Sequence, residues 1–440
     1  MGTSNASEQK NKQRAIRLAW LARIFSNDKS AATDELAEEM LVEHHPDYHI
    51  STFVEGFRPL RKYLDKAGPV SFDVSTIDHS DGDRSYASLS VNGEVIFELV
   101  VRFEVQAPYR VMYWMSHPPL PAGVSVRRYQ PEDAGGCVAL ERACPMEMLD
   151  GSQWIIDRGV YFNDYLNLMQ AIDAAVVVDH NAGDQIIGFF SCALRPVRYH
   201  GEQTFCIYQH HYRVHPDHRA GSVSQALAAF IDPRRTFQNE MPAFPYAMVD
   251  PNNAHLQHMG FPKVDDVTIA RLALPATAGT NSMHPVQDAQ LICELINTTH
   301  AERSLFTPYT PASLAQRVGQ VDSYSAHSFF GDENAVLGLW RVGEVNIGIK
   351  DGVEAVSKVH FVMDYGFRSL AAFEDLIQLV LTSELTQGAT HLAFICDTRA
   401  TEYPFLHDLA DDEQNFDIQT LPFTADAFKD GVTYCDAIYC

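Results

Sequence analysis

The sequence predicts a multidomain protein of mixed α+β and α/β class, with an α+β N-terminal domain followed by two mixed-sheet units. Three observations predict this: helical spacing gives way to period-two alternation early in the chain, strands and helices alternate after residue 124, and that alternation recurs after residue 283. A chain of 440 residues is also too long for one ordinary core. The expected domains are 14–120, 124–274 and 283–440, after a disordered tail at 1–13.

The N-terminal domain is expected to place helices first and an antiparallel meander afterwards. Apolar residues at helical spacing predict helices around Leu18, Leu36 and Leu60. Alternating apolar residues predict the strands, which are expected at 72–74, 87–91, 95–105 and 109–115. The dipeptide Asn92-Gly93 predicts a two-residue hairpin turn between two of them.

This layout resembles the cone-shaped SnoaL-like fold, also called nuclear transport factor two-like, over residues 14–118. Members of that group are enzymes or dimerising and ligand-holding modules. We expect the noncatalytic role because the segment shows no convergent acid and base, and the resemblance allows a homodimer through this domain. The run 44–49, HHPDYH, fits no metal-ligand spacing and is expected to be a solvated loop.

The middle unit is expected to alternate strands with helices. Strands are expected at 124–128, 174–178, 186–193 and 243–249. Helices are expected from Pro131, whose residue type favours the first helical turn, and over Tyr161, Tyr165, Leu168 and Ile172. A strand, a small-residue turn and a helix follow in Thr204–Leu227, with Val223, Leu227, Phe230 and Ile231 on one helix face. A turn of this kind presents unpaired backbone N–H groups at a helix N-terminus, which favours an anion such as pyrophosphate.

The last unit repeats the order of elements of the middle one. Helices are expected near 289–296, near Leu314 and over 370–380, and strands at 327–330, 335–340, 359–363 and 392–395. This order favours an internal duplication. The small-residue turn is absent from the repeat, because only Tyr365-Gly366-Phe367-Arg368-Ser369 stands at the corresponding place.

Composition restricts the partners and the compartment. The formal net charge of -24 opposes binding to nucleic acid and to anionic membranes and favours a cationic small molecule, unless it serves solubility alone. The eight cysteines form no CxxC pair and are expected to be reduced core residues. With no targeting signal and no apolar run of membrane-spanning length, we expect a cytoplasmic protein.

The middle unit resembles the GNAT (GCN5-related N-acetyltransferase) superfamily over residues 124–265. Four features carry the resemblance and occur in the family's order: Val214-His215-Pro216, Arg219–Ser224, Leu227, and Asn252-Asn253 with Gly260-Phe261. The last unit resembles a second, degenerate GNAT domain, which we expect to cover a sheet edge or to form a wall of the acceptor pocket.

The resemblance implies acetyl-CoA as co-substrate and no metal. The main chain of Tyr212 to Val214 would pair with the pantetheine arm. The implied pyrophosphate loop is Arg219, Ala220, Gly221, Ser222, Val223 and Ser224, and Asn253 belongs to the later motif. Both family glycines are replaced, by Ser222 and Ser224, and serine disfavours a positive φ. A tight turn without a ligand is the alternative.

Acylation of an amine needs a base, because only the free amine attacks a thioester. In the family that base often lies on the central strand, nine or ten residues before the loop arginine. His210 stands in that window and is the expected catalytic base, with His211 as second candidate, pointing to the opposite sheet face. In the family, a tyrosine five residues before the phenylalanine of the Gly-Phe pair usually acts as the general acid. Leu256 stands at that position, so the proton donor to the leaving thiolate is unassigned.

The sequence therefore favours an acyl-CoA-dependent N-acyltransferase, an N-acetyltransferase that transfers an acetyl group to a small-molecule amine in a ternary complex. The alternative is a noncatalytic protein on the same scaffold that binds or senses acyl-CoA or another small ligand. The sequence does not distinguish among an amino acid, an aminoglycoside-like compound, a polyamine and a protein amine as acceptor.

Overall fold

The computed structural model describes the chain at residues 12–13, 15–23, 70–74, 84–103, 111–169, 172–199, 202–219, 222–231, 244–252, 263–276, 279, 281–420 and 433–434. The chain divides into two compact units. Unit 1 comprises Met1–Arg128, Ala175–Gly188 and Asp217–Arg235, and unit 2 comprises Tyr129–Ala174, Phe189–Pro216 and Thr236–Cys440. The division passes through the strands β8 (Ile172–Asp179) and β9 (Gln185–Tyr199).

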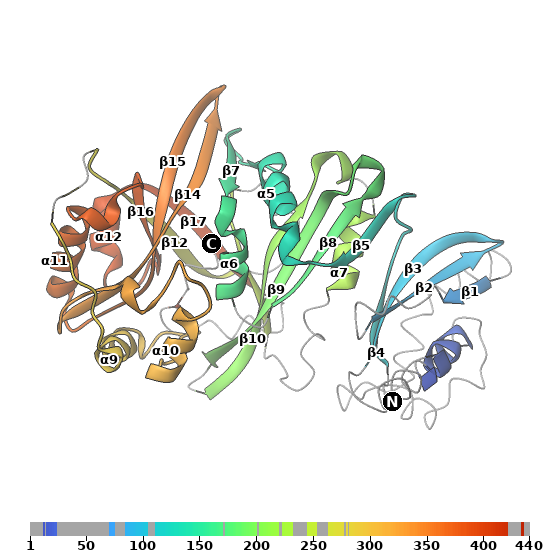
Figure 1. The fold of residues 1–440 in the computed structure, drawn as a ribbon, viewed down its shortest axis with the longest axis horizontal. Coiled ribbons are helices and arrows are strands. Elements are labelled where there is room, and N and C mark those ends of the chain that lie inside the picture. Colours follow the sequence, from blue (N-terminus) through green and yellow to red (C-terminus); the bar gives the residue numbers. More distant parts are fainter. Residues whose placement is uncertain are drawn as a thin grey trace. The chain divides into compact units, whose positions relative to one another are not determined.

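Unit 1 contains an antiparallel sheet in the order β1-β2-β3-β4 (Figure 1). Its strands are β1 (Val70–Val74), β2 (Arg84–Val91), β3 (Glu94–Phe103) and β4 (Val111–His117). Asn92 (φ 53°) and Gly93 (φ 83°) form the turn between β2 and β3. Positive φ at both positions is what a two-residue hairpin requires, so the predicted meander and its turn are confirmed.

The helices predicted for this unit are described only in part. Residues 12–13 and 15–23 are helical. Leu18 and Leu21 are buried, as the apolar spacing predicts. The helices predicted around Leu36 and Leu60 lie outside the described residues, as does the run 44–49. The SnoaL-like resemblance therefore stays a prediction.

Unit 1 also contains β5 (Val124–Arg128), which pairs antiparallel with β8, and the helix α7 (Val223–Phe230). Val223, Leu227, Phe230 and Ile231 are all buried, which confirms the predicted helix face. The helix contacts β4 and β5. It also passes close to Gly188, where an added Cβ would lie 3.0 Å from atoms of both Val223 and Leu227. A side chain there would require the side chains of Val223 and Leu227 to shift by a few tenths of an ångström.

Unit 2 is built on one mixed sheet with helices around it (Figure 1). Its helices are α5 (Ala134–Ala143), α6 (Phe162–Leu168), α9 (Ala289–His300), α10 (Pro311–Val318), α11 (Leu370–Leu381) and α12 (Tyr403–Leu409). Its further strands are β6 (Met146–Glu147), β7 (Gln153–Asp157), β10 (Glu202–Val214), β11 (Phe244–Val249), β12 (Lys263–Ala273), β13 (Phe329–Gly331), β14 (Ala335–Lys350), β15 (Val353–Phe367), β16 (His391–Asp397) and β17 (Ala410–Thr420). The predicted helix over 161–172 is too long, because Ile172 already begins β8.

The strand order in unit 2 is β9-β10-β11-β17-β12-β16-β15-β14-β7-β6, with β13 on β14. This order contains two similar halves. In each, a long strand pairs in parallel with a later strand over three residue pairs, β10 with β11 and β15 with β16. The last strand of each half then pairs with the other half, β12 with β16 and β17 with β11. The halves thus exchange their last strands, which fixes them to each other within one sheet.

The second half fills the space beside its own long strand with protein. Pairing of β15 with β16 ends at Phe361, and helix α9 contacts the rest of β15. The Phe367 amide donates to Thr299 Oγ1 (2.6 Å), and His300 Nε2 lies 2.8 Å from the Tyr365 carbonyl oxygen. Side chains of α9 thus satisfy these two backbone groups of β15, so neither is open to a ligand.

Gly366→Ala is expected to destabilise unit 2 by at least about 3 kcal/mol, above the usual overpacking cost. A Cβ at Gly366 would lie 2.3 Å from Ile296 N and 2.3 Å from Leu295 C, which are backbone atoms of α9 and do not move aside. Urea unfolding measures the effect. Gly135→Ala on α5 is the control, because its Cβ meets nothing within 4 Å and a helical alanine stabilises. Equal stability of the two variants would contradict the close helix–strand approach.

Every cysteine among the described residues is free and buried, as the sequence predicts: Cys137, Cys144, Cys192, Cys206, Cys293 and Cys396. In the part of the chain that the structure describes, no helix combines the length and the apolar character that crossing a bilayer requires.

Candidate functional site

The sheet opens between β10 and β11. The two strands pair in parallel only through Cys206, Ile207 and Tyr208, whereas β11 continues to pair with β17 on its other edge as far as Val249. His211 lies in the middle of β10 with φ at 55°, in the left-handed region that non-glycine residues rarely occupy. One such residue ends the regular extension of a strand, as in a β-bulge. The edge of β10 beyond Tyr208 is therefore not covered by β11.

The same backbone conformation places two histidines together. Consecutive residues of a regular strand point to opposite faces, and the sequence predicts this for His210 and His211. That prediction is wrong, because the His210 and His211 Nδ1 atoms are 2.6 Å apart and both side chains line one cavity. The positive φ of His211 turns its side chain to the face of His210. Ser191 Oγ lies 2.9 Å from His210 Nδ1 and completes the group.

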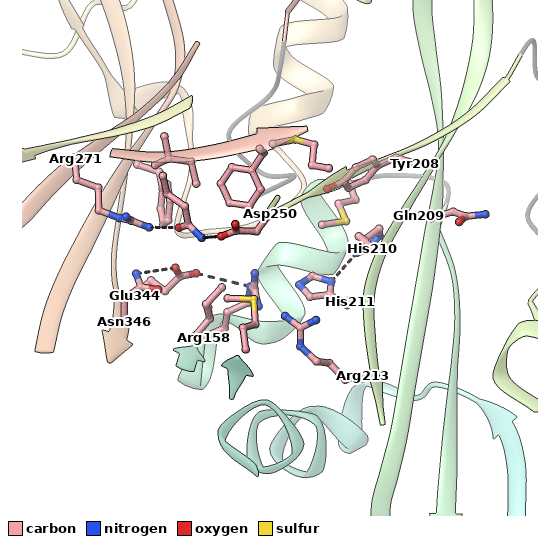
Figure 2. A pocket seen from close by; sticks show the side chains of 18 residues that line it. Arg158, Tyr208, Gln209, His210, His211, Arg213, Asp250, Arg271, Glu344 and Asn346 are labelled. Carbon is pink, nitrogen blue, oxygen red and sulfur yellow. Dashed lines mark hydrogen bonds and ion pairs between the residues drawn. The ribbon is translucent and has the colours of Figure 1, made fainter. Parts of the chain in front are cut away.

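The cavity beside these histidines has a volume of about 120 Å³ and lies wholly within unit 2. Figure 2 shows His210 and His211 on one side, Glu344 and Asn346 on the other, and Arg158 with Arg213 below. Methionine, isoleucine and phenylalanine side chains fill the rest of the wall: Met146, Ile156, Met169, Met248, Ile269, Phe361 and Phe416. Both halves of the sheet contribute side chains to the cavity wall.

His210 is buried, with 8% of its surface exposed, and its Nε2 atom has no hydrogen-bond partner. Its ring stacks on Tyr208 at a centroid distance of 5.3 Å. Burial, reinforced by the charge of Arg158, lowers the pKa of His210 to about 3, and the same causes hold the pKa of His211 well below its usual value. Both imidazoles are therefore neutral at neutral pH.

A buried ionic network forms the lower wall of the cavity. The Arg158 guanidinium bonds the Glu141 carboxylate, lies 3.7 Å from Glu344 Oε2, and covers the Tyr165 ring at 4.7 Å. Tyr165 donates its hydroxyl hydrogen to Glu344, and Asn346 Nδ2 donates to the same carboxylate (3.2 Å). Burial raises the pKa of Glu141, while the two carboxylates outweigh burial and raise the pKa of Arg158. The network fixes Arg158 beside the histidines.

Asp250 follows β11 and lines the cavity, as do Arg271 of β12 and Gln414 of β17 (Figure 2). Gln414 Nε2 donates to Asp250 Oδ2 (2.7 Å), and Arg271 Nη2 donates to Gln414 Oε1 (2.8 Å). Arg271 Nη1 bonds the Asp412 carboxylate at 2.6 Å. This chain of polar groups joins residues far apart in sequence and holds the Asp250 carboxylate in place.

The expected cofactor residues after β10 are described in part. Val214 ends the strand, and its carbonyl oxygen accepts from Cys144 Sγ (3.3 Å); Tyr212 is exposed, its ring edge-on to Phe190. A turn at Pro216–His218 leads to Arg219. Ala220, Gly221 and Asn253 lie outside the described residues.

The two serines in place of glycine adopt ordinary backbone conformations. Ser222 is the N-cap of α7 with φ at −74°, and Ser224 lies in its first turn. Neither needs a positive φ, so serine causes no backbone strain at either position. The Ser222 hydroxyl donates to the Pro119 carbonyl oxygen (2.9 Å), so it ties the helix start to the preceding linker.

Sequence reasoning missed most of the cavity wall. Arg158, Asp250, Arg271, Glu344 and Gln414 carry no motif, and β7, β12 and β17 were not predicted as strands. The signal that was present is Asp250 itself, which follows a predicted strand directly in front of Asn252-Asn253.

Comparison with known proteins gives a likeness of fold. No protein-family model and no curated protein matches this sequence. Two structures of Saccharomyces cerevisiae N-myristoyltransferase with bound myristoyl-CoA superpose on this chain at a TM-score of 0.51 and 10% sequence identity. In the structure that also holds inhibitors, the match covers 69% of this chain and 81% of the N-myristoyltransferase chain. In the other structure, it covers 83% of this chain and 92% of the N-myristoyltransferase chain. A GCN5-related N-acetyltransferase from Kribbella flavida scores 0.36 at 14% identity, covering 69% and 72%, which is too low to support an argument. The chain has a fold similar to that of N-myristoyltransferase.

Proposed function

We propose that this protein is an acyl-CoA-dependent N-acyltransferase that moves an acetyl group from acetyl-CoA to the amine of a small molecule. The opening between β10 and β11 beside the buried His210 supports this most strongly. An uncovered strand edge offers backbone groups to an extended ligand such as a pantetheine arm, in the manner of an added strand. The small cavity at the edge provides a place for the reaction with His210 in its wall.

The pyrophosphate of CoA is assigned to Arg219, Ala220, Gly221, Ser222, Val223 and Ser224. The first turn of an α-helix holds N–H groups without intrahelical partners and a partial positive charge, which suit a pyrophosphate. The negative φ of Ser222 and the helical position of Ser224 support the assignment, because they remove the objection that serine would strain this turn. Tyr212, Val214 and Asn253 are assigned to the rest of the CoA molecule.

His210 is assigned as the base. With its hydrogen on Nδ1, shared with Ser191 Oγ and His211 Nδ1, the imidazole keeps its Nε2 lone pair free of any hydrogen-bond partner. The amine nitrogen attacks the thioester carbon, Nε2 accepts the proton that this step makes acidic, the C–S bond breaks, and the thiolate takes up a proton. A neutral, weakly basic imidazole can accept this proton, because the amine nitrogen becomes acidic once it has bonded to the thioester carbon. His211 holds the ring of His210 in place.

The last unit is assigned as a degenerate GNAT domain of a tandem pair. Two observations support this. Its elements follow the order of the first half, and α9 occupies the place where the first half has an open strand edge. Its contribution to the reaction is the wall of the cavity that holds Glu344 and Gln414.

Calorimetry with acetyl-CoA tests the proposal. Wild-type protein is expected to bind acetyl-CoA, and Gly221→Trp is expected to abolish binding, because the indole occupies the place of the pyrophosphate. Gly135→Trp is the matched control, since it adds the same bulk at an exposed helical position with open space around it. Absence of binding to the wild type would contradict the proposal.

Thiol release across a panel of amines then separates an enzyme from a binding protein. Acetyl-CoA, octanoyl-CoA and myristoyl-CoA are compared in the same assay. Faster release from acetyl-CoA is expected, because a cavity of only about 120 Å³ favours a short acyl group beside an acceptor. Binding without release with any amine would favour the acyl-CoA sensor instead.

A further inference from the structure

Asp250 is a buried carboxylate without a cationic partner. Only 3% of its surface is exposed, and it lines the cavity. Its Oδ1 accepts from the backbone amide of Asn252 (2.7 Å) and its Oδ2 from the amide of Gln414 (2.7 Å). Both donors are uncharged, and no ion pair to Asp250 occurs among the described residues. Buried charges in proteins are ordinarily paired, so this carboxylate is set to receive a cation.

The arginines around the cavity are engaged by other carboxylates. Arg158 is held by Glu141 and Glu344, and Arg271 by Asp412. The third arginine of the wall, Arg213, interacts electrostatically with Glu141. Each of the three arginines that line the cavity thus interacts with a carboxylate, whereas Asp250 forms no ion pair among the described residues.

A second unmet group belongs to a residue that lines the same cavity. His210 Nε2 is buried without a hydrogen-bond partner, and as an acceptor it needs an N–H or O–H from the ligand. A carboxylate that lacks a cation and an imidazole that lacks a donor are both satisfied by a ligand with positively charged N–H groups. An anionic or zwitterionic ligand would bring its carboxylate among arginines that are already neutralised.

We infer that Asp250 is the counter-ion for an ammonium group of the acceptor, which makes the substrate a cationic amine without a carboxylate. This inference deepens the proposed function and rests on it for the reaction, but binding of the ammonium to Asp250 is a property of the apoprotein. A monoamine would bind through the nitrogen that reacts after losing its proton. A diamine would keep one ammonium on Asp250 and present the other nitrogen to His210.

The test measures ligand binding by calorimetry and acyl transfer by thiol release. The ligands are a monoamine, a diamine, an α-amino acid and an alcohol that has the structure of the best amine with a hydroxyl in place of its ammonium group. Wild type is expected to bind the amine about ten- to a hundredfold more tightly than the alcohol, as a charged hydrogen bond requires. Asp250→Asn, of the same size, is expected to bring that ratio close to one and to raise KM with kcat little changed.

The control is Asp411→Asn on β17, which removes an exposed carboxylate that pairs with His391 outside the cavity. It is expected to leave the ratio of amine to alcohol unchanged. Asp250→Ser serves as a second variant if Asp250→Asn does not fold, and thermal unfolding of each variant reports its folding.

Failure of this inference and failure of the proposed function look different. If transfer occurs but amine and alcohol bind equally, or if the amino acid is the best acceptor, Asp250 is not an ammonium site and the acyltransferase stands. If acetyl-CoA does not bind, the proposed function fails, while an amine affinity that depends on Asp250 still supports the ammonium site. An amine affinity unchanged in Asp250→Asn overturns the inference in either case.

Discussion

His210→Gln is expected to lower kcat for acyl transfer by about 10²- to 10⁴-fold, the contribution of a positioned general base. Glutamine has a similar length but cannot accept the proton from the attacking nitrogen. The affinity for acetyl-CoA is expected to stay unchanged, because the assigned CoA residues lie further along the chain. Steady-state kinetics with the best amine of the panel measures the effect. Asp411→Asn, an exposed residue outside the cavity, serves as control, and an unchanged kcat in His210→Gln would remove His210 from the mechanism.

The pH dependence distinguishes this histidine from an ordinary one. Burial and Arg158 lower the pKa of His210 from 6.5 to about 3. The rate per free amine is therefore expected to stay level as the pH falls through 6.5, where an ordinary histidine base would become protonated.

The unfolded chain binds this proton below pH 6.5, whereas the folded protein binds it only near pH 3. The free energy of unfolding therefore falls as the pH falls through this window, and His210→Gln is expected to reduce that fall.

Arg158→Met is expected to lower the free energy of unfolding by about 3–5 kcal/mol, because it leaves buried carboxylates without their cation. Arg158 bonds Glu141 and lies 3.7 Å from Glu344, and all three side chains are almost fully buried. Methionine preserves much of the volume, so the loss reports charge rather than a cavity. Urea unfolding monitored by fluorescence measures it.

Arg142→Met on helix α5 is the matched control. Arg142 bonds Asp157 at 2.6 Å, but its side chain is 58% exposed, so its removal is expected to cost less than about 1 kcal/mol. Adding Glu141→Gln to Arg158→Met is expected to restore part of the loss, because one buried charge disappears. Equal losses in Arg158→Met and Arg142→Met would show that the buried network does not stabilise the fold.

Elements whose side chains have a local pattern were predicted correctly from the sequence. Asn92 and Gly93 form their hairpin because both residue types tolerate positive φ. Helix α7 buries Val223, Leu227 and Phe230 because their spacing matches a helical turn. In these cases a few neighbouring residues determine the conformation, so the rest of the fold is not needed to predict it.

Strand β17 shows why other elements could not be predicted. Its sequence, ADDEQNFDIQT, lacks an apolar alternation, yet it lies between β11 and β12. Its polar side chains are stabilised by groups on those strands and beyond: Asp412 bonds Arg271, Asn415 accepts from Thr268 (2.6 Å), and Gln414 donates to Asp250. Cross-strand partners of this kind become neighbours only in the folded sheet.

The sequence by itself predicted many of the strands and helices, including the helix that begins at Val223, and it favoured His210 as the base. The tertiary structure decided which groups face His210. It placed His211 on the same face through one left-handed residue, and it brought Asp250, Arg271 and Glu344 to one cavity from strands far apart in the chain. The physical reason is that local propensity depends on neighbours in sequence, whereas the charge and the hydrogen-bonding needs of a cavity depend on neighbours in space.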